Sequence, residues 1–443
     1  MQQNLTEGPV IKTMMKFAVP MILGNLLQQC YNIADTLIVG RFLGAGALAA
    51  VGSAFTLMTF LTSILLGLCM GSSTVLSIYY GQKNYQRFKD SVGTSFLLIA
   101  ALTVLLTAAS FLLLDEIILF LQVPEEIQPL MKDYLIVIFF GIAATFLYNY
   151  FSSFLRAIGN SVVPLVFLAC SALLNIGLDL FFVVGLSRGT AGAAEATVIS
   201  QYISGIGILL YTWIKFPDIR SSLFCFRLSS LKEIANFSVL TCIQQSVMNL
   251  GILMVQGLVN SFGTTIMAAF AAAVKIDSFA YMPVQDFGNA FSTFIAQNYG
   301  ADRKDRIRQG ILGALSSAMA FCILISILIW IFAKPLMLLF IDPQETAILS
   351  EGIRYLHIEG SFYCGIGCLF LLYGLYRALE HPGMSLVLTI ISLGTRVLLA
   401  YRLSATAFFG VTGIWWSVPI GWFLADLVGI VYFWKKKKAS IFS

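Results

Sequence analysis

Four polar side chains stand within apolar stretches of the first half of the chain: Asp35, Asn175, Asp179 and Thr197. A carboxylate at the centre of a bilayer costs ~2.5–3.5 kcal/mol on insertion scales, so acids in apolar stretches are candidates for function. Two carboxylates, an amide and a hydroxyl are hard oxygen donors, which suit a small cation such as Na+. Two neighbouring carboxyl groups suit a shared proton equally well. We therefore predict a cation-binding site at these four residues that takes Na+ or H+.

The spacing of these residues along helices predicts that they meet. Asp35 lies five residues before the expected end of one span, Asp179 seven before the end of another, and Thr197 eight after the start of a third. At 1.5 Å of rise per residue, all three fall roughly 8–12 Å below the same surface. Asn175 precedes Asp179 by four residues, on the same helix face. The alternative is that each acid only forms a hydrogen bond between packed helices, which is more common for the Thr197 hydroxyl.

The elements that position these residues are membrane-spanning helices. Of the 443 residues, 58% are hydrophobic and 11% are charged, whereas a soluble domain carries about 25% charged residues. Of the 27 Lys and Arg, nineteen fall on the side of the amino terminus and six on the other side, so the positive-inside rule places both termini in the cytoplasm. Long apolar stretches predict twelve spans: 13–40, 46–80, 91–114, 130–153, 161–186, 189–215, 234–261, 265–299, 308–333, 349–378, 382–408 and 410–434.

The chain repeats itself. Tyr80-Gly81 recurs as Tyr299-Gly300, and Arg156-Ala157 recurs as Arg377-Ala378. Six spans per half return the chain to its starting side, so the halves insert the same way up. We therefore predict an all-α membrane protein of twelve transmembrane helices, in two six-helix lobes related by a pseudo-twofold axis along the membrane normal, with a cleft between them. The expected parts are an N-terminal lobe (1–215), a cytoplasmic linker (216–233), a C-terminal lobe (234–434) and a cytoplasmic basic tail (435–443).

The second half does not repeat the four polar residues. Their counterparts, in the same order, are Val255, Arg396, Ala400 and Val418.

Pro20 interrupts the first span and predicts a conformational hinge, with a static kink as the alternative. We expect Lys275 to neutralise Asp277. Five further residues are candidates for a substrate cleft, with plain helix packing as the alternative: Gln244, Gln245, Asn249, Gln256 and Asp286.

Several function classes are disfavoured. The sequence has no P-loop motif, so we expect no ATP-driven pumping by this chain itself. An intramembrane aspartyl protease would use two acids on two helices, but the residues around Asp35 and Asp179 lack the motifs of that class. A flippase for lipid-linked precursors is expected to line its cavity with several basic residues, and only Lys275 and Arg396 are available. A receptor or membrane scaffold would not need the acids.

Over essentially its whole length the chain resembles the MATE family, the multidrug and toxic compound extrusion transporters. The residues that carry the resemblance are Val19-Pro20, Asp35-Thr36, Tyr80-Gly81, Arg156–Gly159 and the pair Asn175 and Asp179. The resemblance implies two helical bundles, antiport of drugs against protons or sodium, and a cation site in the first lobe. One departure is that Gln244 and Gln245 stand where a subgroup has a Glu, which argues against a cation site in the second lobe.

Together these observations predict a secondary active multidrug efflux antiporter, not an enzyme. It would export amphipathic, often cationic organic compounds in exchange for H+ or Na+, with a lipid-linked precursor flippase as the alternative. We expect a multi-pass protein of the plasma membrane with no cofactor besides the coupling ion. Its partners would be small drug-like substrates and the lipid bilayer. We expect a monomer with no nucleic-acid partner and no ATPase subunit.

Overall fold

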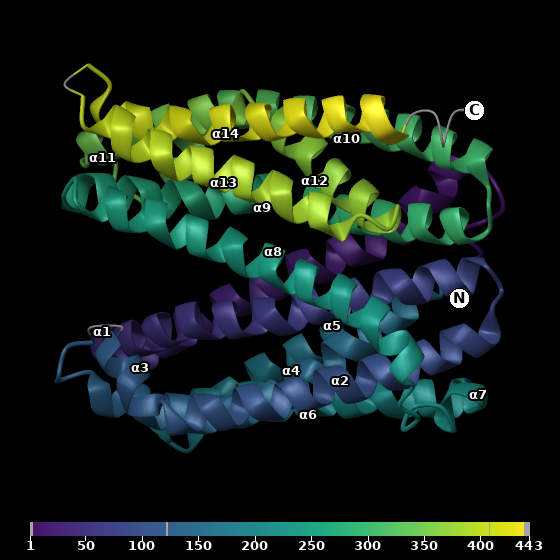
Figure 1. Cartoon of the computed structure of the whole chain (residues 1–443). Helices are drawn as coiled ribbons and strands as arrows, with labels where there is room; N and C mark the ends of the chain where they lie inside the picture. Colours follow the sequence, from purple (N-terminus) through teal and green to yellow (C-terminus); the bar gives the residue numbers. More distant parts are fainter. Residues whose placement is uncertain (1–2, 121–122, 407, 438–443) are drawn as a thin grey trace. The chain divides into compact units, whose positions relative to one another are not determined.

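The protein is built from helices along its described length. The structure, a computed structural model, describes residues 3–120, 123–406 and 408–437, and these contain no strand. Most of the predicted basic tail, from Lys438 on, lies outside the described residues. The elements in Figure 1 are α1 (Val10–Gly81), α2 (Tyr85–Leu112), α3 (Leu114–Phe120), α4 (Gln128–Ala157), α5 (Val162–Asp179), the π-helix η1 (Leu180–Gly185), α6 (Gly189–Lys215), α7 (Pro217–Arg220), α8 (Leu228–Asn260), α9 (Thr264–Gly300), α10 (Lys304–Met337), α11 (Thr346–Gly360), α12 (Tyr363–Ala378), α13 (Pro382–Ser404), α14 (Gly410–Tyr432) and the π-helix η2 (Phe433–Lys437).

The helices are long and apolar enough to cross a bilayer. Among the described residues, 11 helices meet this condition, or 12 when α11 and α12, which are bent by 52°, count as one span. Helix α1 contains two spans, because its backbone breaks at Gly44, where φ is 86°. A glycine with φ of 94°, Gly263, stands between α8 and α9 at the corresponding place in the second half. Positive φ costs glycine little. The prediction of an all-α fold with about twelve spans in two lobes is confirmed.

The chain divides into two compact units. The first contains Leu23–Cys242 and the residues before Leu5, and the second combines Leu5–Ile22 with the described residues from Ile243 on. The start of α1 therefore belongs with the second half of the chain, and the start of α8 belongs with the first. The two crossing points, after Ile22 and after Cys242, occupy corresponding places in the duplicated halves.

Two glycines of α1 explain why the start of α8 packs in the first unit. A Cβ on Gly67 would lie 2.5 Å from the Cα of Cys242, and a Cβ on Gly71 would lie 2.4 Å from the carbonyl oxygen of Phe237. Real Cβ atoms do not approach other atoms so closely, so only glycine lets the two backbones pack at this distance. Small residues spaced by four are the usual means of close helix packing in membranes.

The start of α1 is held in the second unit by Arg306 of α10. The guanidinium group donates to the carbonyl oxygen of Gly8 at 2.6 Å and to those of Leu5 and Glu7 at 3.1 Å. Its Nε atom donates to the side chain of Asn298 at 3.0 Å. These bonds satisfy carbonyl groups of the segment before α1 that no helix would satisfy.

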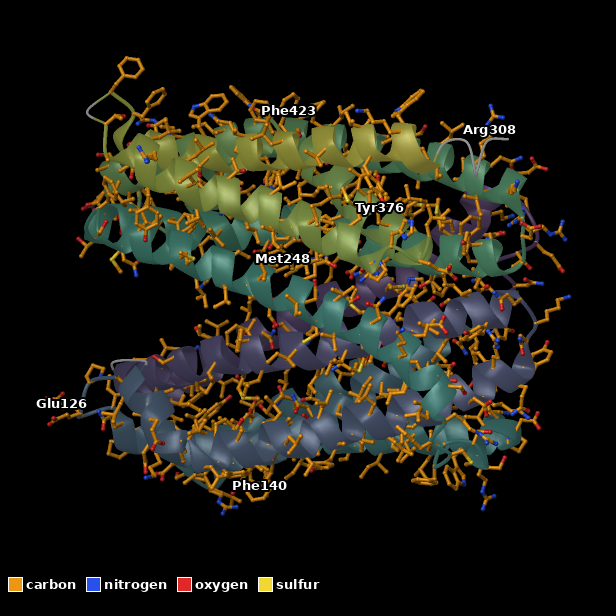
Figure 2. The ribbon with its side chains drawn as sticks, in the orientation of Figure 1. Glu126, Phe140, Met248, Arg308, Tyr376 and Phe423 are labelled. Carbon is orange, nitrogen blue, oxygen red and sulfur yellow. The ribbon has the colours of Figure 1, made fainter. Side chains whose placement is uncertain are left out.

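Within each unit the helices pack through aromatic and aliphatic side chains. In the first unit α4 packs against α6, and in the second α13 packs against α14 and α9 against α12. Tyr376 is completely buried, and its hydroxyl donates to the carbonyl oxygen of Gly429. In contrast, Phe140 and Phe423 point away from the helices in Figure 2 and are 58% and 65% exposed. Aromatic side chains exposed along apolar helices are expected where a helix faces lipid.

Candidate functional site

The first predicted site residue, Asp35, lies in the span of α1 that ends at Gly44. The span extends four residues beyond the predicted end, so Asp35 is nine residues from the break at Gly44. Its side chain is half-buried. One carboxylate oxygen, Oδ1, is fully buried and accepts no hydrogen bond from the described residues. Helix α1 thus carries a carboxyl group with an unsatisfied acceptor into an apolar environment.

Asp179 and Asn175 approach from α5. Asp179 is the last residue of α5, is 0% exposed, and is followed directly by the π-helix η1. Single π-turns within helices are rare and are often found at functional sites. Asn175 lies one turn before Asp179 and is 2% exposed. Its side-chain amide donates to the hydroxyl of Thr197 on α6 at 3.3 Å. The structure therefore connects α5 to α6 through two of the four predicted residues.

The two aspartates also come together. Their carboxyl groups lie close enough to interact with each other, and the hydroxyl groups of Tyr31 and Tyr134 lie within range of both acids. Asp35, Asp179, Asn175 and Thr197 thus form one cluster in the first unit, drawn from α1, α5 and α6. The argument from equal depth along the helices predicted the proximity of the two aspartates, and the role of these residues as a cation site stays a prediction.

The cluster contains more acceptors than donors. Four buried oxygens accept no hydrogen bond from the described part of the chain: Asp35 Oδ1, Asn175 Oδ1 and both oxygens of Asp179. A buried acceptor without a partner costs about 1–3 kcal/mol, and more when it is charged. Either a proton on one carboxyl group or a cation among the oxygens would remove this cost. Oxygen donors of this kind suit a hard ion such as Na+. No group of three or more His, Cys, Asp or Glu that could hold a metal ion occurs among the described residues.

The predicted cleft residues belong to the second unit, whereas the cluster belongs to the first. Gln244 and Asp286 are buried, at 3% and 6% exposed. Gln245, Asn249 and Gln256 are half-buried. Asn249 donates to the backbone of Gln245 at 3.2 Å, and Gln256 donates to Asn260 at 2.8 Å, so both amides make bonds along their own helix. Their assignment to a substrate cleft stays a prediction.

The predicted hinge residue, Pro20, lies inside α1. The non-helical backbone within α1 is at Gly44 rather than at Pro20. The division between the two units crosses α1 after Ile22, two residues beyond Pro20. The role of Pro20 as a hinge stays a prediction.

A second buried acidic group in the second unit was not predicted. Asp277 of α9 is 5% exposed and accepts a hydrogen bond of 2.7 Å from the hydroxyl of Tyr363 on α12. Glu359 of α11 is 1% exposed and lies within range of Asp277, as does Arg396 of α13. Asp277 and Glu359 each stand thirteen residues after the start of their helices. The same depth argument, applied to the second half, could therefore have brought them together.

The expectation that Lys275 neutralises Asp277 is wrong. Lys275 is exposed and forms no hydrogen bond or ion pair with the described residues, whereas Asp277 is buried against Tyr363. Residues two apart on a helix do not face each other, because each residue turns the helix by about 100°. The positive charge near Asp277 comes from Arg396 instead.

Comparison with known protein families assigns the chain to a family. The sequence profile named MatE matches residues 20–181 and 238–402. The chain belongs to the MatE family. The two matched segments occupy corresponding places in the two halves of this MatE chain, which agrees with the internal duplication. The family prediction made from the sequence is confirmed.

Two curated relatives of this MatE chain match it over nearly its whole length. The protein named "Probable multidrug resistance protein YpnP" of Bacillus subtilis is 30% identical, over 98% of this chain and 98% of the relative. A protein of Shewanella oneidensis named "FAD transporter" is 27% identical, over 95% of this chain and 93% of the relative. The family and these relatives are transporters, and the Bacillus protein is named for probable multidrug resistance.

Solved structures share the fold. A multidrug resistance MATE family transporter of the MOP superfamily, solved in an outward-facing conformation, superposes with a TM-score of 0.88 at 23% identity. The match covers 97% of this chain and 96% of that chain. The MatE chain therefore has the two-lobed fold of solved MATE transporters and is a multi-span membrane protein.

Proposed function

We propose that this MatE protein is a secondary active antiporter that exports amphipathic, often cationic organic compounds in exchange for inward H+ or Na+, and that it has no enzymatic activity. One observation carries the proposal. Asp35, Asn175 and Asp179 present four buried acceptor oxygens for which the described residues supply no donor. A transporter that exchanges a small cation needs a site that is incomplete without it, and this cluster has that property.

The cluster can drive transport only if the cation prefers one conformation and the substrate prefers another. In the proposed cycle, the cation binds between α1 and α5 and stabilises the arrangement that brings Asp35 to Asp179. Substrate then binds preferentially to the arrangement without the cation. One elementary charge moving through 100 mV supplies ~2.3 kcal/mol, which supports about a 50-fold gradient of substrate.

The relatives support an organic substrate of substantial size. Multidrug resistance is the function named for the Bacillus relative, and the Shewanella relative is named for transport of FAD, a large flavin compound. We further propose that the protein is a monomer in the plasma membrane. We place both termini in the cytoplasm, because most basic residues fall on the side of the termini. No cofactor besides the coupling ion is part of the proposal.

The decisive experiment measures efflux of a fluorescent organic cation from proteoliposomes under imposed gradients. A pH gradient and a sodium gradient are applied separately, so that the coupling ion is identified together with the activity. We expect wild-type protein to export the dye under at least one of the two gradients. We expect Asp35→Asn to abolish gradient-driven efflux while the protein stays folded in detergent, because the amide cannot carry the negative charge that binds the cation.

Asp115→Asn is the matched control. Asp115 is an exposed acid that pairs with Lys132 at 2.7 Å, far along the chain from the cluster. Exposed ion pairs contribute little, so this variant should export dye at the wild-type rate. Efflux by Asp35→Asn at the wild-type rate refutes the assignment of the cation site, and absence of dye export by the wild-type protein under both gradients refutes the antiporter.

A further inference from the structure

Lys275 stands exposed within a membrane-spanning helix and has no partner in the described part of the chain. It lies eleven residues after the start of α9, which puts it ~16 Å along the helix axis. Its side chain forms no hydrogen bond and no ion pair with the described residues, and the nearby Asp277 is turned into the packed interior. A lysine at this depth needs either water or an anion, because lipid solvates neither its charge nor its donors.

The face of α9 that carries Lys275 is mixed, because the exposed residues Ala271 and Phe279 are apolar and half-buried polar side chains follow toward the end of the helix. Seven exposed or half-buried residues recur at intervals of four and three along the helix, with Val274, Phe279, Tyr281 and Pro283 also accessible beside them. The seven define one stripe: Ala271, Lys275, Ser278, Met282, Gln285, Asn289 and Thr293. Five of these seven side chains carry a hydrogen-bonding group. We call this set the α9 stripe. A helix face of this composition is expected to contact water rather than lipid.

Helix α10 of the same unit shows the contrast. From Ala320 to Phe332, every fully exposed side chain is apolar, among them Ile323, Leu324, Ile327 and Ile331. That face has the composition of a lipid-facing surface. Helices α9 and α10 pack against each other in the second unit. We attribute the difference in polarity between their exposed faces to what each face contacts.

The first half exposes a polar residue at the position that matches Lys275, but it carries no charge. Gly44 corresponds to Gly263 and Tyr80 to Tyr299 with the same offset, so the position of Lys275 corresponds to Thr56. Thr56 is also exposed, and its hydroxyl donates back to the carbonyl oxygen of Gly52. The two halves therefore both expose a polar residue at this place, and only the second half makes it a cation.

We propose that the α9 stripe lines the aqueous path of the substrate and that Lys275 binds an acidic group of the substrate, a carboxylate or a phosphate. The preferred substrates among the amphipathic compounds are then those that also carry an acidic group, including zwitterions. An ammonium group offers three donors and a full positive charge, which is the complement of such a group. This inference rests on the proposed transport function and specifies its substrate class.

The test compares two dyes that differ in one group. A rhodamine methyl ester is a cation, and its parent rhodamine acid has the same ring system with a free carboxylate. Binding of each dye to purified protein in detergent is measured by fluorescence polarisation. We expect Lys275→Thr, which restores the first-half residue, to weaken binding of the acid about fivefold and to leave binding of the ester unchanged. Lys275→Arg should keep the preference for the acid.

Lys334→Thr is the matched control, because Lys334 is an exposed lysine near the end of α10 and outside the α9 stripe. It should bind both dyes as the wild-type protein does. An equal ratio of the two affinities in wild type and Lys275→Thr, or no saturable binding of the acid to wild type, overturns the inference. Gradient-driven efflux of the ester dye in that case leaves the antiport proposal standing, so the two failures are distinguishable.

A second measurement tests the exposure to water directly. Lys275→Cys, Ser278→Cys and Ile327→Cys are made in a background whose native exposed cysteines, Cys30, Cys170 and Cys225, are replaced by serine. The reconstituted variants are treated with a negatively charged, water-soluble thiosulfonate. We expect labelling at the two positions of the α9 stripe and none at Ile327→Cys. Equal protection of all three cysteines overturns the inference, because the stripe would then face lipid.

Discussion

Replacing Asp179 with asparagine should stabilise the protein and uncouple it. Both carboxylate oxygens of Asp179 are buried without a donor among the described residues, and the neighbouring Asp35 has a further unsatisfied acceptor. Asp179→Asn removes one of two neighbouring negative charges and supplies an amide that donates to Asp35. Satisfying one buried acceptor is worth about 1–3 kcal/mol, so we expect a gain of about 2 kcal/mol in the free energy of unfolding.

The assay is thermal unfolding in detergent, followed by intrinsic fluorescence. At ~2.1 cal/mol/K per residue, a chain of this length has an unfolding entropy of roughly 0.9 kcal/mol/K, so 2 kcal/mol corresponds to about 2 °C in Tm. The measurement is made in sodium-free alkaline buffer and then repeated with added sodium or at lower pH. Wild type should gain stability from the cation, by about 2.7 kcal/mol at a hundredfold excess over its Kd. Asp179→Asn should start higher and respond less.

Asp115→Asn again serves as the control, and its Tm should follow the wild type under all conditions. The reasoning fails if Asp179→Asn melts below the wild type in sodium-free alkaline buffer and still responds fully to the cation. That result would mean that the negatively charged carboxylate of Asp179 already has hydrogen-bond donors, which the asparagine loses. A cation site centred on this residue would then be excluded.

Two further predictions concern packing in the two units. Gly71→Ala should lower the stability by about 1–3 kcal/mol, because its Cβ would lie 2.4 Å from the Phe237 carbonyl oxygen, whereas Gly52→Ala, with no atom within 4 Å of its Cβ, should match or exceed the wild-type Tm; equal Tm values for the two variants contradict the close packing of α1 and α8. Tyr363→Phe should cost about 1–3 kcal/mol, because it removes the 2.7 Å donor to buried Asp277; an unchanged melting curve for this variant would show that the acid does not depend on that donor.

The positions of the spans were predictable because hydropathy and length decide them. The predicted span 349–378 corresponds to α11 and α12, and the only feature missed there is the 52° bend between them. The break at Gly44 was placed within a few residues, because an apolar run of this length must turn and glycine permits the turn. The proximity of Asp35 to Asp179 was predictable because an α-helix rises by a constant distance per residue, so the depth of a residue in a span can be counted from the sequence.

The partners of packed helices were not predictable in the same way. Two glycines four residues apart, such as Gly67 and Gly71, are typical of close helix packing, but nothing in the sequence names α8 as the partner of α1. Asp277 was interpreted as paired with Lys275 because the two are close in sequence, although helical geometry places them on different faces. Depth along a helix can be counted from the sequence, whereas the rotation of one helix against another depends on the packed structure.

The duplicated halves differ in how the acids nearest their centres are balanced, and this difference supports the proposed cation site in the first half. In the second half, Asp277 accepts a hydrogen bond from Tyr363, and Arg396 supplies a positive charge that belongs to the chain. In the first half, the position that corresponds to Arg396 is Asn175, which is neutral and donates to Thr197. Asp35 and Asp179 therefore have no basic side chain paired with them among the described residues. A charge that the chain does not supply must come from solution, which is the condition for a site that binds and releases a cation in each cycle.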